Sequence, residues 1–568
     1  REGTVWPKDG MFAVSGLSGS MLLTPTGLTL TNVRGHRGDA ELTGKGEVRW
    51  PQGAVPQLSL EALAKNLSLD ASLYQLLSPA ARSAWDAVGP EGTVDVDIRY
   101  SGAASDARVS EPSAPLASVD SGPAGALPAD VSPTPAIDPG AMASASSLTK
   151  GFSVTIHPRT LAVTPRVVPY RLEDVRGMIR FEPECFVLDG IAARHGKASI
   201  TLSGRGTTGK DAAWDLRLAG RDVPVDAELF KALPATLSGL LESLKIKGAM
   251  DFDFSKLTYR DVVDAEAASP ATSPAPGALT ADVDFATKIT VNGIGVDVGV
   301  PLDDVRGTFE LAGQVRDGSV GELDGKIDLE SLRLADRTAR RFRATVHKPA
   351  GEPALQLGKM QAELAGGELA GQVDLAFPEG EASRYAINLV LRNADVRELA
   401  GERDRDIRGR LNASLALAGN WSDLSSRRGR GDVSVEGKEM YRIPLVLGLL
   451  QITNLALPIT KPFNEATSRY SVDGQRVTFE QIDLRSQSMS MQGNGHLDFG
   501  TKKVRMTFTT DAGNWAHIPF IGDFMQGARN ELLQIHVRGS LEEPKVSAQS
   551  MNTFQTTVDE VFKGSGER

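Results

Sequence analysis

Hydrophobic and polar residues alternate strictly in many short segments of this chain. In "DLRLAG", Leu216 and Leu218 alternate with Asp215 and Arg217. A period of two places successive side chains on opposite faces of a β-strand, and antiparallel sheets with one solvated face carry this pattern. We therefore expect a mainly β protein of curved antiparallel sheets with short helices.

The same alternation recurs in equivalent segments elsewhere in the chain. If these segments form neighbouring sheets, their apolar faces can join into one wall. The alternating apolar positions are Leu58, Leu60, Leu216, Leu218, Ile387, Leu389, Leu391, Val504, Met506 and Phe508. Glycine pairs in "GKG", "GRG" and "GNG" are expected at strand edges or bulges, where a residue without Cβ permits bending.

An internal repeat explains this recurrence. "GSMLLTPTGLTLTNV" (19–33) aligns without a gap on "GMIRFEPECFVLDGI" (177–191), and "KNLSLDASLYQLL" (65–77) aligns on "RDVPVDAELFKAL" (221–233). "VVPYRLEDVRGMIRF" (167–181) also resembles "DVGVPLDDVRGTFEL" (297–311). Two later units follow the plan more loosely, so we expect about four related units.

Each of the first two units changes period after an alternating strand. Asp70 and Asp226 each precede apolar residues at helical spacing, which predicts helix N-caps at both positions. Ser78 and Pro79 predict the cap and first turn of a second helix. We expect short helices here, followed by a return to strands.

Composition and charge exclude several classes of function. The chain has 568 residues, with 62 Lys and Arg against 72 Asp and Glu, and no basic block that suggests nucleic-acid binding. Cys185 is its only cysteine, so no intrachain disulfide or cysteine-based zinc cluster can form. No cofactor, metal site or catalytic residue is predicted.

Two acidic pairs could in principle act as the acid and base of a glycosidase. Glu173 and Asp174 lie in "LEDVRG", and Asp303 and Asp304 lie in "LDDVRG". A capped, solvated turn is the preferred interpretation of both. An enzyme, such as a carbohydrate-active β protein, is the third hypothesis for function.

One stretch, residues 440–463, is unusually apolar. It is interrupted by prolines and is too short to span a bilayer. A buried helix that plugs the last sheet is the first interpretation, and an apolar element that faces a membrane or a partner is the second. Its candidate contact residues are Ile443, Leu445, Val446, Leu449, Leu450 and Ile452.

The C-terminal part resembles the AsmA-like proteins, which are relatives of TamB. The resemblance rests on Asp473-Gly474 between two strands, on "GNGHLDF", and on "VRGSLEEPKV" with Glu543-Pro544; it is good over 429–550 and weaker elsewhere. It implies a repeating β-groove in the periplasm, an inner-membrane anchor, and a role in moving phospholipid toward the outer membrane or supporting its assembly. The chain lacks the N-terminal transmembrane helix of such proteins, so we expect that an anchor is missing from this fragment.

With this resemblance, we expect four units in an elongated, taco-like β-groove. The expected organisation is a groove unit at 1–105, a disordered insertion at 106–147, a second unit at 148–262, a disordered insertion at 263–278, a third unit at 279–428, an AsmA-like unit at 429–550 and a tail at 551–568. The ten alternating apolar residues become candidates for lining the groove.

The first hypothesis for function is therefore a periplasmic protein that binds and conducts phospholipid acyl chains between membranes. Its expected partners are phospholipid, the membrane through the missing anchor, and an envelope protein. The alternative is a structural or protein-interaction scaffold of the envelope, in which the same alternation fills closed sandwiches.

Overall fold

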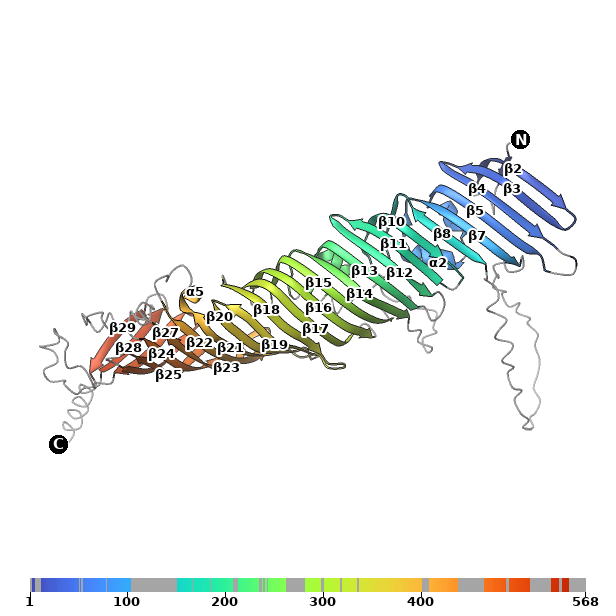
Figure 1. The fold of residues 1–568 in the computed structure, drawn as a ribbon. Coiled ribbons are helices and arrows are strands. Elements are labelled where there is room, and N and C mark those ends of the chain that lie inside the picture. Colours follow the sequence, from blue (N-terminus) through green and yellow to red (C-terminus); the bar gives the residue numbers. More distant parts are fainter. Residues whose placement is uncertain are drawn as a thin grey trace, which may run out of the picture. The chain divides into compact units, whose positions relative to one another are not determined.

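The computed structural model describes residues 3–5, 12–50, 52, 55–77, 79–103, 151–166, 168–183, 185–207, 213–233, 238, 241–242, 244–261, 281–297, 301–316, 319–334, 337–378, 380–400, 408–437, 464–486, 490–510, 533–540 and 544–550. The chain divides into two compact units, 1–238 with 253–283 and 239–252 with 284–568, which are described separately. Strands in open antiparallel sheets dominate, with short helices (Figure 1). The expected mainly β fold with short helices is confirmed.

The first unit is an antiparallel meander. Its main sheet runs β2–β3–β4–β5–β7–β8–β10–β11–β12–β13, while β1 pairs with β2, and β9 pairs with β6 and β10. The strands are β1 (Gly3–Val5), β2 (Val14–Thr24), β3 (Gly27–Arg37), β4 (Ala40–Arg49), β5 (Gln57–Ser68), β6 (Pro90–Glu91), β7 (Thr93–Ala103), β8 (Phe152–Pro158), β9 (Leu161–Val163), β10 (Leu172–Phe181), β11 (Cys185–His195), β12 (Ala198–Thr207) and β13 (Ala213–Pro224). β14 (Ala249–Asp261) and β15 (Ala281–Asp297) contribute residues to both units.

In the second unit each strand from β16 onward pairs antiparallel with the next along the chain. These strands are β16 (Pro301–Arg316), β17 (Ser319–Leu334), β18 (Arg337–Lys348), β19 (Ala354–Leu364), β20 (Gly367–Ala376), β21 (Arg384–Asp395), β22 (Arg410–Asn420), β23 (Asp423–Glu436), β24 (Glu465–Asp473), β25 (Arg476–Arg485), β26 (Ser490–Asp498), β27 (Lys503–Thr510), β28 (Leu533–Ser540) and β29 (Pro544–Ser550).

Short helices begin at the aspartates that the sequence marks as caps. The side chain of Asp70 accepts a hydrogen bond from the backbone N–H of Leu73 at the start of α1 (Ala71–Leu76), and Asp226 caps α3 (Ala227–Ala232) in the same way. These side chains satisfy donors that the first helical turn leaves free. α2 (Pro79–Val88) begins at Pro79, as predicted, and α5 (Val396–Ala400) follows Asp395.

Among the described residues, three buried apolar clusters lie along the sheets. In the first unit, Leu67, Val94, Leu161 and Val175 belong to a cluster against which Leu73 of α1 packs. In the second unit, one cluster joins β15–β19, and another joins β25–β28 around Phe508. Long parts of the sheet between these two clusters belong to neither of them.

A bulge recurs at positions that the sequence repeat aligns. In each case one strand gains a residue relative to its partner, which increases local twist. The register shifts fall between Leu30 and Val33, Leu188 and Ile191, Leu357 and Met360, and Phe479 and Ile482.

The acidic pairs do not form the expected solvated turns. Glu173 and Asp174 lie inside β10, and Asp303 and Asp304 lie inside β16. The register shifts on both sides of Arg176 and of Arg306 make each motif a double bulge, with positive φ at Asp174 and Asp304. The repeated segments "LEDVRG" and "LDDVRG" therefore form bent strands. Their aspartates can adopt the left-handed backbone conformation that this bend requires.

Several sequence predictions fall outside the described residues. They include both predicted disordered insertions, 106–147 and 263–278, and the C-terminal tail 551–568. The apolar stretch with Ile443, Leu445, Val446, Leu449, Leu450 and Ile452 also falls there.

Candidate functional site

Strand β21 shows the alternation on which the proposed wall depends. Ile387, Leu389 and Leu391 are half-buried, whereas Asn388 and Val390 between them are exposed. The side chains of β21 therefore separate into an apolar face and a solvated face. We call the face that carries Ile387 and Leu389 the apolar face of the second unit.

Strand register extends this face across the second unit. Residues paired directly in antiparallel strands point to the same side of the sheet. Ile387 pairs with Val373 on one side and Leu417 on the other. The whole row from β16 to β28 is Leu311, Gly325, Val346, Leu357, Val373, Ile387, Leu417, Gly429, Val472, Val477, Leu497, Val504 and Gly539, without a polar side chain.

The first unit has a comparable apolar face. Leu58 and Leu60 lie on the same face of β5 as Ala64, and Leu216 and Leu218 share one face of β13. A row of pairs joins these two strands: Ala64, Val96, Ile156, Ile179, Leu188, Gly204 and Leu216. The structure thus brings the four sequence-predicted residues of this unit onto one face.

Most of the predicted wall residues are partly open to solvent. Leu58, Leu216 and Leu218 are half-buried in the first unit, and Leu60 is 38% exposed. In the second unit, Ile387, Leu389 and Leu391 are half-buried and belong to neither buried cluster of that unit. Such side chains have lost part of their water contact and still offer apolar area to a ligand.

Val504, Met506 and Phe508 differ from the other seven candidates. They are 3%, 4% and 0% exposed, and they pack with Ile535 and Val537 of β28 in the cluster of β25–β28. We expected them to line an open groove, but in the structure they are interior residues. Their alternation is the same as that of β21, and packing against neighbouring side chains buries them.

Glycines on the apolar face accept side chains from the next strand. A Cβ at Gly206 would lie 2.6 Å from the ring of Trp214, and one at Gly371 would lie 2.7 Å from Cδ2 of Leu389. Because a larger residue would collide there, glycine lets the neighbouring side chain lie flat on the sheet. Of the two expected positions, strand edges or bulges, the second is confirmed: "GKG", "GRG" and "GNG" lie within β4, β12 and β26, and the neighbouring strand bulges beside each of them.

Aromatic residues gather at one end of the apolar face of the first unit. The Phe186 ring lies 4.6 Å from that of Phe181 and 5.1 Å from that of Trp214, in edge-to-face contact. Toward the other end, Leu73 and Leu76 of α1 pack on the cluster that includes Leu67 and Val94. In this unit a helix covers part of the face, and the aromatic end lies away from it.

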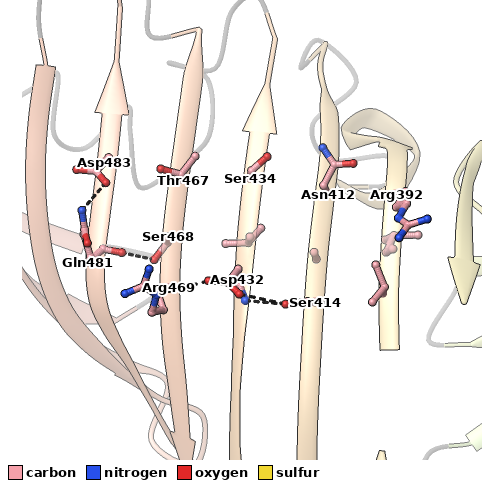
Figure 2. A pocket seen from close by; sticks show the side chains of 14 residues that line it. Arg392, Asn412, Ser414, Asp432, Ser434, Thr467, Ser468, Arg469, Gln481 and Asp483 are labelled. Atoms are coloured by element: carbon pink, nitrogen blue, oxygen red, sulfur yellow. Dashed lines mark hydrogen bonds and ion pairs between the residues drawn. The ribbon is translucent and has the colours of Figure 1, made fainter. Parts of the chain in front are cut away.

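The opposite face of the second unit holds a shallow hollow whose lining includes both polar and apolar side chains. It has a volume of about 530 Å³ and crosses β21–β25 (Figure 2). The hydroxyl of Ser414 lies 3.4 Å from Oδ2 of Asp432 and accepts a hydrogen bond from the Asp432 backbone N–H at 3.1 Å. Arg469 lies 3.7 Å from the other oxygen of Asp432. These polar groups bind one another, so we assign them to support of the sheet.

The electrostatics of the described carboxylates reflect nearby cations and hydrogen-bond donors. The hydrogen bond from Arg159 lowers the pKa of Asp95, and the one from Arg306 lowers the pKa of Asp304. A general acid for glycoside hydrolysis needs a raised pKa, which is the opposite of the shift at Asp304.

A metal site is also not evident: within the described residues, no group of three or more His, Cys, Asp or Glu side chains could hold a metal ion.

Sequence reasoning missed several members of the apolar rows. Leu415 and Leu417 of β22 pair with Leu389 and Ile387, and Tyr385 lies two residues from Ile387 on the same face. The alternation in "LNASLALAG" carries the signal for the two leucines. The positions of β23 that lie on the apolar face are harder to recognise, because glycines occupy positions 429 and 431.

Comparison with known proteins adds no family. No protein-family model matches the chain, and no curated protein sequence matches it significantly. Among the described residues, no helix combines the length and hydrophobicity that crossing a membrane requires.

Proposed function

We propose that this protein holds phospholipid by its acyl chains on the apolar faces of its sheets and lets the chains move along them. The observation that carries the proposal is the row of apolar and glycine residues through Ile387, which continues from strand to strand in register. Leu357, Val373, Ile387 and Leu417 in this row are half-buried, so apolar area is left for a ligand.

The physical chemistry of acyl chains suits such a surface. Each buried methylene contributes about 0.8 kcal/mol, so a chain of about sixteen carbons could gain up to ~13 kcal/mol before ordering and incomplete contact are subtracted. The attraction has no preferred direction, so a chain can slide along a uniform row without a deep trap. A repeated apolar strand lengthens that row, and it requires no catalytic group.

We place this activity in the periplasm, with an inner-membrane anchor on the full-length protein and a role in outer-membrane assembly. This placement comes from the resemblance of residues 429–550 to AsmA-like proteins. The partners that follow from it are phospholipid, the membrane and an envelope protein.

A pair of acidic substitutions tests the proposal. Leu216→Glu combined with Leu389→Glu puts a charge on the apolar face of each unit, and we expect phospholipid that copurifies from a native membrane extract to be lost. The matched control is Arg217→Glu with Asn388→Glu, because these exposed neighbours point to the opposite face. Lipid is quantified by mass spectrometry, and circular dichroism checks the β content.

Two results would count against lipid binding. One is full lipid occupancy in the folded apolar-face variant, and the other is an equal loss of lipid in the polar-face control. Either result would leave the second candidate, a protein-interaction scaffold. The packed cluster of Val504, Met506 and Phe508 favours that candidate locally, because no ligand is needed to bury these residues.

A further inference from the structure

In the described parts of β19–β27, one charged side chain lies on the apolar face of the second unit. In β23, Gly429 pairs with Leu417 and Val472, which places residue 429 on the apolar face. Arg427 lies two residues earlier in the same strand, so its side chain starts on that face. By register, the other residues of this face in the described parts of β19–β27 are uncharged.

The guanidinium of Arg427 is incompletely satisfied. Its Nε is buried and has no hydrogen-bond partner. No ion pair joins Arg427 to a carboxylate among the described residues. A buried donor without a partner is destabilising, and a cation beside apolar side chains favours an anionic partner.

Other cations show how this fold usually satisfies such a group. Lys348 starts on the same face of β18, and its Nζ donates to the carbonyl oxygens of Gly321, Pro349 and Glu352 at 3.0–3.3 Å. Arg428 lies next to Arg427 on the opposite face, and its Nη1 lies 2.7 Å from Oδ1 of Asp473. Arg427 differs from these two cations because its Nε is buried without a hydrogen-bond partner and no carboxylate among the described residues pairs with it.

The surroundings of Arg427 are polar at the edge of the sheet and apolar further in, which suits an amphiphilic ligand. A Cβ placed on Gly419 would lie 3.1 Å from Oη of Tyr385 and 3.3 Å from Cα of Arg427, so both residues flank this glycine. All three lie near the edge where β20 connects to β21 and β22 to β23. From there the apolar rows run inward, first to Ile387 and Leu417, then to Leu389 and Leu415.

The length of this apolar stretch matches one lipid chain. The six residue steps from Tyr385 to Leu391 span about 20 Å at roughly 3.3 Å per residue. Half of a bilayer hydrocarbon core is about 15 Å thick. A chain that starts beside Tyr385 could therefore lie on the apolar face over its whole length.

We propose that Arg427 binds the phosphate of a phospholipid headgroup at this edge, while the acyl chains lie over the rows of Ile387 and Leu389. A guanidinium presents several N–H donors in a planar fork that fits phosphate oxygens, and such charge-assisted bonds are strong. This inference rests on the proposed lipid-binding function and assigns the headgroup a fixed place on the sheet. Lipid movement along the face would then include release from Arg427.

The test compares two lipids that share acyl chains and differ in phosphate. The full chain and its Arg427→Gln variant are titrated with fluorescent phosphatidylglycerol and with diacylglycerol of the same chain length. We expect Arg427→Gln to weaken phosphatidylglycerol binding by roughly tenfold to a hundredfold and to leave diacylglycerol binding unchanged. The control Arg428→Gln removes the same charge from the opposite face and should change neither affinity.

The possible failures are distinguishable. Unchanged phosphatidylglycerol binding in Arg427→Gln would overturn the headgroup site and leave acyl-chain binding standing. An equal loss of both lipids would also overturn it, because the side chain would then act through the fold. If the unsubstituted protein bound neither lipid, the proposed function itself would fail together with this inference.

Discussion

Strands β20–β22 and strands β25–β28 carry the same alternation of apolar and polar residues, but they use it differently. Ile387 and Val504 lie in one continuous row of paired residues, yet Ile387 is half-buried and Val504 is 3% exposed. Both regions belong to the second unit. The difference shows that alternation determines which face is apolar, whereas the size and packing of neighbouring side chains determine whether that face stays open.

Packing against neighbouring strands accounts for the contrast. In β25–β28, Met506 and Phe508 lie beside Ile535 and Val537, and the ring of Phe508 occupies the space above Gly493. Around β21, the row contains Val373, Ile387 and Leu417, which belong to neither buried cluster of that unit. Contacts among the side chains of β25–β28 close one region, whereas the row through Ile387 joins no such buried cluster.

The largest expected effect is that of truncating Phe508. We expect Phe508→Ala to lower the free energy of unfolding by about 3–5 kcal/mol, because it leaves a cavity in a fully buried site. Leu389→Ala should cost only ~1 kcal/mol, since this residue is already half exposed. Urea unfolding followed by circular dichroism measures both losses of unfolding free energy. Equal losses in the two variants would contradict the distinction between a packed and an open region.

A glycine substitution tests the packed region more directly. A Cβ on Gly493 would collide with the Phe508 ring and lie 2.8 Å from the carbonyl oxygen of Thr507. We expect Gly493→Ala to destabilise the protein by about 1–3 kcal/mol through overpacking. Gly321→Ala is the control, because its Cβ would be 3.5 Å from the nearest atom. A tolerated Gly493→Ala would show that the cluster is loosely packed.

The helix cover of the first unit offers a third, smaller test. Asp70→Ala removes both the N-cap of α1 and the ion pair with Arg37, in which Nη2 of Arg37 lies 2.7 Å from Oδ2 of Asp70. We expect a loss of ~1–2 kcal/mol and more binding of a hydrophobic dye, because Leu73 and Leu76 would pack less well. Unchanged dye binding would mean that the helix does not limit access to the apolar face.

The same aspartate predicts a pH dependence. Burial alone raises the pKa of Asp70, but hydrogen bonds from the Leu73 N–H and from Arg37 outweigh it and hold this pKa below its usual value. A depressed folded-state pKa stabilises the protein fully above the unfolded value of about 3.9, and this stability is lost as the pH falls through the lower folded value. Unfolding experiments between pH 6 and pH 3 should show this loss in the unsubstituted protein and a smaller one in Asp70→Ala.

Local chemistry made the fold and parts of the site predictable. Asp70 and Asp226 cap helices as expected, because a short acidic side chain before an apolar helix turn satisfies free backbone N–H groups. The motifs around Asp174 and Asp304 were harder, since acidic residues before glycine suit a bulge as well as a turn. Counting back from Val433 in steps of two assigns Arg427 to the apolar face. The glycines at 429 and 431 between them have no side chains, so the sequence shows no alternation there.

By itself, the sequence determined that the chain forms antiparallel strands with one apolar face, where helices α1, α2 and α3 begin, and which segments repeat. Each of these depends on contacts between residues close in the chain or on a period that a single strand enforces. Only the tertiary structure decided that Phe508 is interior while Leu389 remains accessible, and that Arg427 shares a face with Ile387. The reason is that burial depends on side chains from other strands, and strand register brings those residues together across long distances in the chain.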